Sequence, residues 1–407
     1  MINGSKVLDH PIRWAMVGGG KGSQIGYIHR SAALRDNNFQ LVAGAFDINP
    51  ERGMAFAAEL GIDPERGKDF GKQLHVDPER CYPDYKTMFE KEAQREDGIE
   101  AVSIATPNSV HYEVCKAALE AGIHVVCEKP LCFSTEEGEE LVALAKKKNL
   151  VVGVTYGYSG HQMIQQARQM IKNGDLGDIR VINMSFAFGG YNYKIEETNA
   201  AAKWRFDPKK AGPSFAMADV GTHCLYIIEA MIPDMKIDKV LCSKDAFVEG
   251  RELEDNAFTL MRLNGSEHVQ EGAKVYCWSS SINCGARHGH VIRVVGSKAS
   301  IEWDDERPNQ MTYEIEGEPV RRLERGAGYL YEEARVEDRI GGGHAEGLFE
   351  AWANLYRRFA LAIEGMSKGE AEYGDFWYPN AEAGLAGVKW IEKCVESANN
   401  GEVWVKY

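Results

Sequence analysis

The stretch IRWAMVGGGKGS, residues 12–23, decides the fold class. Its residues 12–17 are a short, mainly apolar run that ends in Gly18-Gly19-Gly20, which is the profile of a strand buried in a parallel sheet. A helical pattern follows from Ile25 to Leu34, then a second apolar strand to Phe46 and a helix at 50–60 that has proline at its start and glycine after its end. This part of the chain therefore predicts strand, helix, strand, helix.

The same alternation resumes after a polar, turn-rich segment at 62–83, and it predicts a parallel sheet with helices on both faces. The expected strands are 101–105, 124–127 and 151–154, and the expected helices are 112–121 and 135–147. After about residue 155 the strands become longer and richer in β-branched and aromatic residues. They are expected at 179–188, 237–248, 257–263, 273–282, 290–296 and 299–303, with helices at 161–173, 220–231, 346–363 and 380–399.

We therefore predict an α/β protein of two domains. Residues 1–155 form a doubly wound, nucleotide-binding domain, and residues 156–407 form an α/β domain with a large, open, mostly antiparallel sheet. The second domain is expected to bind the substrate and to mediate oligomerisation.

Composition narrows the possible partners and the compartment. The 407 residues are 44% hydrophobic and 27% charged, as in a globular protein, and carry a net charge of −14. Such a surface repels phosphate backbones and anionic lipid, so neither nucleic acid nor membrane is an expected partner. The sequence has no signal-peptide pattern, no 18-residue apolar stretch and no C-x-x-C pair among its nine cysteines. We expect a cytoplasmic protein.

The glycine run has the spacing of a dinucleotide-binding turn. Gly18, Gly20 and Ser23 fit the pattern G-x-G-x-x-G/A, in which the first glycine allows a tight turn, the second admits a pyrophosphate and the third small residue lets the helix pack closely. The helix that follows offers free N–H groups to the phosphates. Asp47, which ends the second strand, suits the ribose hydroxyls and favours NAD over NADP, although Arg52 leaves dual use open.

Polar residues also follow the next two strands, where open α/β sheets bind ligands outside their carboxyl ends. Thr106-Pro107-Asn108 follows the strand at 101–105, and Glu128-Lys129-Pro130 follows the strand at 124–127. We predict that the cofactor-binding residues here are Thr106, Asn108, His111, Glu128 and Lys129. Lys129 is expected at the nicotinamide end.

Asp219 and His223 stand four residues apart, which places both on one face of a helix. An imidazole that exchanges protons near neutral pH suits the oxidation of an alcohol. Two alternatives stay open: a helix cap beside a buried, hydrogen-bonded histidine, and a metal site that recruits His288 and His290. Because no third ligand has a convincing spacing, we predict no metal site.

Together these motifs resemble the family of glucose-fructose oxidoreductase and inositol dehydrogenase, called Gfo/Idh/MocA, over nearly the whole chain. Gly174-Asp175-Leu176-Gly177 resembles the family's turn before its first long strand, and 343–356 looks like a branch active on inositols and glucosides. The resemblance implies a Rossmann domain followed by an open-sheet domain that often mediates dimers or tetramers. It also implies that Lys129, Asp219 and His223 match the family's catalytic positions.

The expected activity is therefore NAD-dependent oxidation of a secondary hydroxyl of a sugar, glycoside or cyclitol. His223 takes the alcohol proton, Asp219 orients the substrate or the imidazole, and Lys129 stabilises the developing alkoxide or is itself the base. The candidate substrate-binding residues, which could cover a sugar ring or bind its hydroxyls, are Tyr158, Trp204 and His344.

Three alternatives belong to other classes. A family member can retain NAD and oxidise a sugar transiently, so that it acts as a glycosidase or lyase through a keto-sugar. A non-catalytic NAD-binding sensor is a second alternative, against which the joint presence of Lys129, Asp219 and His223 argues. A zinc-dependent alcohol dehydrogenase would need metal in the purified protein.

Overall fold

Two sheets organise the chain, each in its own compact unit. The computed structural model describes residues 2, 7–60, 76–199, 202–370 and 377–407. The parallel-sheet unit comprises residues 3–155 and 352–385, and the large-sheet unit comprises residues 1–2, 156–351 and 386–407. The chain passes from the parallel-sheet unit to the large-sheet unit after Thr155, and residues 352–385 return to the parallel-sheet unit.

The parallel-sheet unit has five strands in the order β2-β1-β3-β4-β5, and every neighbouring pair is parallel. The strands are β1 (Ile12–Gly18), β2 (Phe39–Ala45), β3 (Ala101–Ala105), β4 (His124–Cys127) and β5 (Val152–Val154). Because β1 lies between β2 and β3, the strand order reverses there. Ligands of open α/β sheets bind outside the carboxyl ends at such a point.

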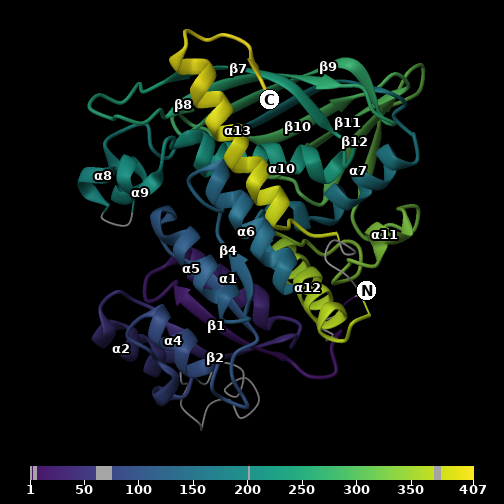
Figure 1. The fold of residues 1–407 in the computed structure, drawn as a ribbon. Coiled ribbons are helices and arrows are strands. Elements are labelled where there is room, and N and C mark those ends of the chain that lie inside the picture. Colours follow the sequence, from purple (N-terminus) through teal and green to yellow (C-terminus); the bar gives the residue numbers. More distant parts are fainter. Residues whose placement is uncertain (1, 3–6, 61–75, 200–201, 371–376) are drawn as a thin grey trace. The chain divides into compact units, whose positions relative to one another are not determined.

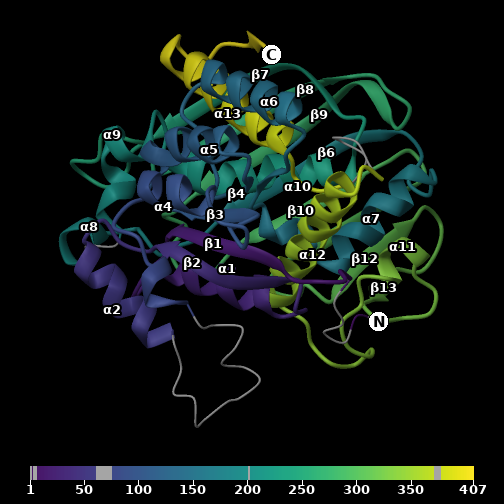
Figure 2. The same cartoon turned by 60° about the horizontal axis from the view of Figure 1, so that its bottom comes forward.

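Helices cover both faces of this sheet, which is why its strands are almost wholly apolar. Figure 2 shows α1 (Gln24–Leu34) and α12 (Leu348–Ser367) on one face, and α4 (Tyr85–Glu92), α5 (His111–Glu120) and α6 (Thr135–Lys148) on the other. α2 (Pro50–Leu60) follows β2. α6 has strong end signals, because Ser134 caps its first turn and Asn149 takes a left-handed conformation after its last.

The large-sheet unit has nine strands in the order β13-β12-β11-β10-β6-β9-β8-β7-β14. Only β6 and β9 pair in parallel among these neighbours. The strands are β6 (Ile179–Ala187), β7 (Lys236–Asp245), β8 (Asn256–Asn264), β9 (Val269–Ser280), β10 (His290–Val295), β11 (Ala299–Asp304), β12 (Gln310–Ile315), β13 (Arg321–Glu324) and β14 (Val405–Lys406).

Helices pack on one face of the large sheet, as Figure 1 shows for α7 (Gln162–Lys172), α10 (Thr222–Met231) and α13 (Ala381–Asn399). Ser397 of α13, for example, accepts a hydrogen bond from the backbone of Cys242 in β7. Three short helices complete the unit: α8 (Ile195–Thr198), α9 (Pro208–Ala211) and α11 (Glu332–Arg335). Within the described ranges, no helix has both the length and the apolar character needed to cross a bilayer.

The predicted fold class is confirmed, and the predicted strands match observed ones apart from shifts at their ends. The sequence prediction missed β12, β13 and β14. β13 and β14 lie at the two edges of the large sheet, and most of their side chains reach solvent, so they lack the alternation of apolar and polar residues that reveals a half-buried strand.

Candidate active site

The glycine turn ends β1 against the end of β3. Gly18 has a φ of +73°, and a Cβ on it would lie 2.5 Å from the Ala105 carbonyl oxygen. The Gly19 N–H donates to that same carbonyl at 3.1 Å. A Cβ on Gly20 would lie 2.6 Å from the carbonyl oxygen of Phe46. The turn is therefore clamped between the ends of β3 and β2, where larger side chains have no room.

Ser23 plays a different part from the one predicted for the third small residue. Its hydroxyl caps α1 by accepting the Gly26 N–H at 3.1 Å. The close approach of the helix to the turn belongs to Gly26, on which a Cβ would lie 2.1 Å from the Gly19 carbonyl oxygen. The other N–H groups of the first turn have no partner within the helix, which is the usual setting for binding a phosphate.

Asp47 and Arg52 are paired with each other beyond the end of β2. The Arg52 guanidinium donates to the Asp47 carboxylate at 2.8 Å, and the Asn49 N–H donates to the same oxygen at 2.8 Å. Partial burial opposes ionisation, but these two donors hold the pKa of Asp47 below its usual value. The side chain is thus an anion at neutral pH, as its predicted ribose-binding role requires.

The residues after β3 differ in their exposure, and His111 is a buried anchor. Thr106 is partly exposed and Asn108 is nearly buried. His111 is fully buried, and its two ring nitrogens lie 2.7 Å from the Pro130 carbonyl oxygen and 3.1 Å from that of Thr106. Burial lowers the pKa of His111. His111 therefore joins the loops after β3 and β4, and its predicted contact with the cofactor stays a prediction.

Glu128 is likewise an internal anchor. Its Oε1 lies 3.1 Å from His29 Nε2 and 2.5 Å from the Thr155 hydroxyl, and the side chain is 7% exposed. Burial alone would raise its pKa, but these donors and the neighbouring Lys129 hold the pKa of Glu128 below its usual value. Lys129 itself is half-buried between this anchored residue and Pro130, whose carbonyl contacts His111. The backbone that carries Lys129 is therefore fixed on both sides.

The anchor continues into the returning segment through a buried hydrogen-bonded chain. The other ring nitrogen of His29, Nδ1, contacts the Tyr356 hydroxyl at 2.5 Å. That hydroxyl lies 2.7 Å from the Ser103 hydroxyl. Trp14 Nε1 donates to Ser103 at 2.9 Å. With the donors running from Trp14 to Ser103, Tyr356 and His29, the Glu128 carboxylate accepts at the far end and every polar group is satisfied.

Asp219 and His223 lie at the junction of two kinds of helix in the large-sheet unit. Asp219 belongs to a π-helical turn, Met217–Gly221, and His223 belongs to α10, which follows directly. π-helical turns are frequent at functional sites. The Asp219 carboxylate is partly exposed and lies 3.8 Å from Arg205 Nε. His223 is 7% exposed.

Aromatic rings pack against the His223 imidazole. The rings of Tyr156 and Tyr158 meet it edge-on, with centroid distances of 5.8 Å and 4.9 Å. The Tyr158 hydroxyl lies 3.2 Å from His288 Nε2. Tyr158 thus contacts the predicted base directly, which places it where a substrate-binding residue is expected.

The two other predicted substrate residues lie differently. Trp204 is in a short 3-10 turn, and its ring packs under the Arg205 guanidinium at 4.7 Å. Through Arg205 it borders Asp219. His344 is exposed, and its Nδ1 lies 3.2 Å from the carbonyl oxygen of Gly341 in its own loop. Tyr158 and Trp204 therefore border the Asp219–His223 region, and the contacts of His344 do not.

Sequence reasoning missed two groups of residues. His29 carries no local motif, and Tyr356 belongs to the stretch 343–356, but no sequence pattern pairs the two, since they meet only through packing between α1 and α12. Asp305 joins His288 and His290 through the pairing of β10 with β11. Lys129 lies in the parallel-sheet unit, whereas Asp219 and His223 lie in the large-sheet unit, so the predicted meeting of all three stays a prediction.

Comparisons with known proteins cover the whole chain. Residues 12–156 match the model of an oxidoreductase family with an NAD-binding Rossmann fold, and residues 168–407 match the model of that family's C-terminal alpha/beta domain. An uncharacterised oxidoreductase of Bacillus subtilis, YfiI, is 53% identical over 100% of both chains.

Two solved structures of an inositol dehydrogenase homologue from Azotobacter vinelandii are similar along their full length. The complex with NAD⁺ is 56% identical, covers 100% of both chains and has a TM-score of 0.93. The complex with NADH and myo-inositol is 55% identical, covers 100% of both chains and has a TM-score of 0.90.

Proposed function

Because this chain belongs to the oxidoreductase family with an NAD-binding Rossmann fold, we propose that it oxidises a secondary hydroxyl of a cyclitol, sugar or glycoside. The observation that carries the proposal is His223, a nearly buried imidazole that two tyrosine rings meet edge-on. Asp219 lies four residues before it, in the π-helical turn that leads directly into α10. An imidazole in such a setting suits proton exchange with an alcohol.

The parallel-sheet unit fits the cofactor that its family uses. The capped start of α1 and the clamped turn at Gly18 and Gly20 suit the pyrophosphate, and the ionised Asp47 suits the ribose hydroxyls. Thr106 and Asn108 would border the cofactor, while His111 and Glu128 would hold the loops in place. When bound, NAD accepts a hydride from the carbinol carbon.

Three side chains would act on the substrate oxygen. His223 would take the hydroxyl proton, with its ring orientation fixed by the flanking tyrosines. Asp219 would orient the substrate or the imidazole and favour the imidazolium that forms. Lys129 would donate to the same oxygen as it gains negative charge, or would serve as the base in place of His223.

Cyclitols lead the proposed substrate classes. The Azotobacter vinelandii relative, 55% identical over its full length, was solved with NADH and myo-inositol. Tyr158 beside His223 offers an aromatic face to a ring's C–H groups and a hydroxyl to its oxygens. The net charge of −14 favours a neutral polyol over a phosphorylated one.

We also propose a cytoplasmic homodimer or homotetramer joined through the open face of the large sheet. That face carries a hollow lined in part by Phe258, Tyr276 and Trp278, and the first two are 53% and 54% exposed. Large apolar groups gathered on one surface mark a protein interface. No disulfide joins any of the nine cysteines, all of which lie in the described part of the chain, as a reducing compartment would keep them.

The test is a panel of inositols, hexoses and glucosides followed by NADH absorbance, with NAD and NADP in parallel. We expect turnover of at least one cyclitol or sugar with NAD. His223→Ala and Lys129→Ala should each lower kcat by about 10² or more while NAD still binds. His268→Ala is the matched control, because His268 pairs with Asp234 and takes no part in the proposed chemistry.

The outcomes separate the proposal from its alternatives. Full turnover in both variants would refute the assigned roles. Release of an aglycone without net NADH would instead indicate the NAD-recycling glycosidase or lyase. Binding of NAD with no turnover of any polyol would indicate a sensor.

A further inference from the structure

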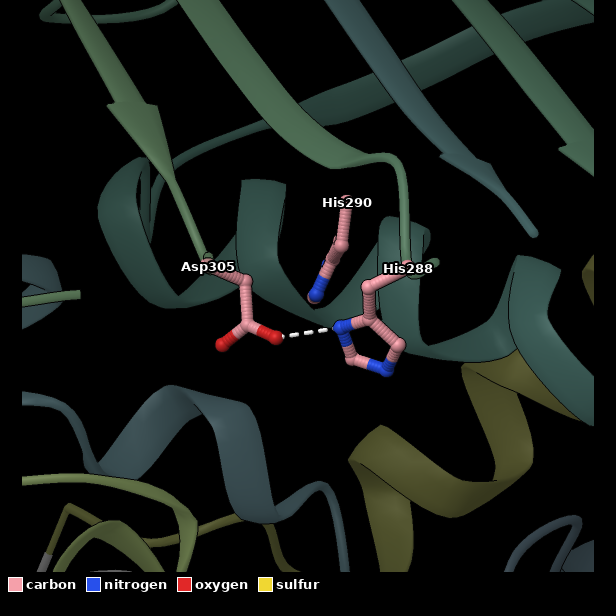
Figure 3. A group of neighbouring side chains, drawn as sticks. All are labelled: His288, His290 and Asp305. Atoms are coloured by element: carbon pink, nitrogen blue, oxygen red, sulfur yellow. Dashed lines mark ion pairs between the residues drawn. The ribbon is translucent and has the colours of Figure 1, made fainter. Parts of the chain in front are cut away.

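We propose that His288, His290 and Asp305 form a site for one divalent transition-metal ion, of which Zn²⁺ and Co²⁺ are suitable examples. One ligand atom from each residue lies within 4.8 Å of the other two. Figure 3 shows all three side chains converging below the ends of two strands, with an ion pair between His288 and Asp305. The site does not depend on the proposed dehydrogenase activity.

The large sheet fixes the three ligands relative to one another. His290 is the first residue of β10, and His288 lies two residues before it. Asp305 directly follows β11, and its N–H donates to the His290 carbonyl oxygen at 3.0 Å. Because β10 and β11 are adjacent antiparallel strands, the ligands are held by sheet register. Sites built on such rigid elements keep a precise geometry.

His290 gives the observation that points most directly to a ligand. Its side chain is fully buried, and neither ring nitrogen has a hydrogen-bond partner among the described residues. The ring stacks on Phe186 at 4.4 Å and meets Trp303 edge-on at 5.7 Å. Figure 3 shows one nitrogen aimed at the space between the other two ligands. An imidazole nitrogen placed in this way can bind a metal ion.

The surrounding contacts are those that orient metal ligands. His288 Nε2 lies 3.2 Å from the Tyr158 hydroxyl, while its Nδ1 faces the carboxylate. His161 Nε2 lies 3.3 Å from the second oxygen of Asp305. Metal-binding histidines usually bond their other ring nitrogen to a polar group, and metal-binding carboxylates are themselves held by hydrogen bonds. His288 meets the first condition, and His161 lies against the carboxylate of Asp305.

The donor set indicates the class of ion. Two imidazoles and one carboxylate suit Zn²⁺, Co²⁺ or Fe²⁺, whereas Ca²⁺ and Mg²⁺ prefer oxygen ligands. The carboxylate of Asp305 supplies the negative charge that balances the cation. Three protein ligands leave one position open in a tetrahedral site.

The site shares its aromatic surroundings with His223. The Tyr158 ring lies 4.9 Å from the His223 ring and 4.8 Å from the His290 ring. The Phe186 ring lies 6.1 Å from His223 and stacks on His290. A ligand at the open position would therefore lie beside the proposed base. The sequence prediction of no metal site overlooked Asp305, which lies fifteen positions beyond His290 and is brought back only by the strand pairing.

The test uses the untagged full chain, stripped with a chelator and titrated with Co²⁺. We expect one equivalent to bind with visible d–d absorption, and one Zn²⁺ per chain to be retained after dialysis, measured by plasma mass spectrometry. Asp305→Asn and His288→Ala should each weaken Co²⁺ binding by more than tenfold. His161→Ala, which removes a supporting contact, should weaken it by about 10–100-fold.

His268→Ala is the control, since it removes another histidine paired with an aspartate and should leave binding unchanged. Circular dichroism reports whether each variant folds. His290→Gln should also weaken Co²⁺ binding, but His290 is buried and this variant can fail to fold. In that case His288→Ala still decides the question, because the His288 side chain is more exposed. A stripped chain that binds neither ion would overturn the proposal, and so would equal binding by the wild type, Asp305→Asn and His288→Ala. No readout needs a substrate, so the dehydrogenase proposal can fail separately.

Discussion

Replacing Tyr356 with phenylalanine tests how the returning segment supports the nucleotide-binding unit. The change removes one hydroxyl, which contacts His29 Nδ1 at 2.5 Å and Ser103 Oγ at 2.7 Å. Tyr356, His29 and Ser103 are at most 1% exposed, so water cannot replace the lost partner. Two buried groups then lose their hydrogen-bond partner: His29 Nδ1, which accepts, and the Ser103 hydroxyl, which donates.

The expected cost follows from that count. Each buried polar group left without a partner costs about 1–3 kcal/mol, so the loss of both partners in Tyr356→Phe should lower the free energy of unfolding by about 2–6 kcal/mol. Because the same chain reaches Glu128 beside Lys129, we also expect a weaker affinity for NAD. Urea unfolding by linear extrapolation measures the first quantity, and an unchanged slope would show that the change is one of stability.

Tyr378→Phe is the matched control. Tyr378 is 4% exposed in the same unit, and its hydroxyl has no hydrogen-bond partner among the described residues. Its removal should be neutral or slightly stabilising, because a buried polar group without a partner is itself a cost. If Tyr356→Phe destabilises the protein no more than Tyr378→Phe does, the buried chain is not the support that we describe.

Three further predictions concern pH, cofactor choice and assembly. Burial lowers the pKa of His124 to about 4, whereas the side chain in the unfolded chain binds a proton near pH 6.5. The stability that depends on neutral His124 is therefore fully present above pH 6.5 and falls as the pH drops toward 4. We expect about 2 kcal/mol less stability at pH 5 from this residue, and His124→Asn, which keeps an acceptor for the Val151 N–H, should remove that part of the slope in urea titrations. Asp47→Ala should weaken NAD binding by about tenfold, measured by calorimetry, and should reduce the ratio of the affinities for NAD and NADP. An unchanged ratio would count against the proposed contact of Asp47 with the ribose. Trp278→Glu should shift the mass found by light scattering toward the monomer, and an unchanged mass would argue against the open face as the interface.

The sequence predicted the parallel sheet well because its signals are local. Apolar strands such as 12–18 end directly in glycine or polar residues, and the helices between them have strong end signals such as Ser134 and Asn149. Those same strand ends carry the candidate cofactor residues, so the spacing that predicts the fold also predicts much of the site.

What depends on packing could not be predicted this way. His111 and Glu128 follow the expected strands, yet their side chains turn inward to hold neighbouring loops. The role of Gly26 depends on how closely α1 approaches the turn, and no fingerprint spacing carries that information. The group of His288, His290 and Asp305 exists only because two strands pair, so linear spacing gives it no pattern.

Transfer of hydrogen from a carbinol carbon to the cofactor tests the central claim most directly. Fully C-deuterated myo-inositol incubated with the enzyme and NAD should give NADH that carries one deuterium, detected by mass spectrometry. Reduced cofactor without deuterium, or no reduced cofactor from this or any other polyol, would contradict the account.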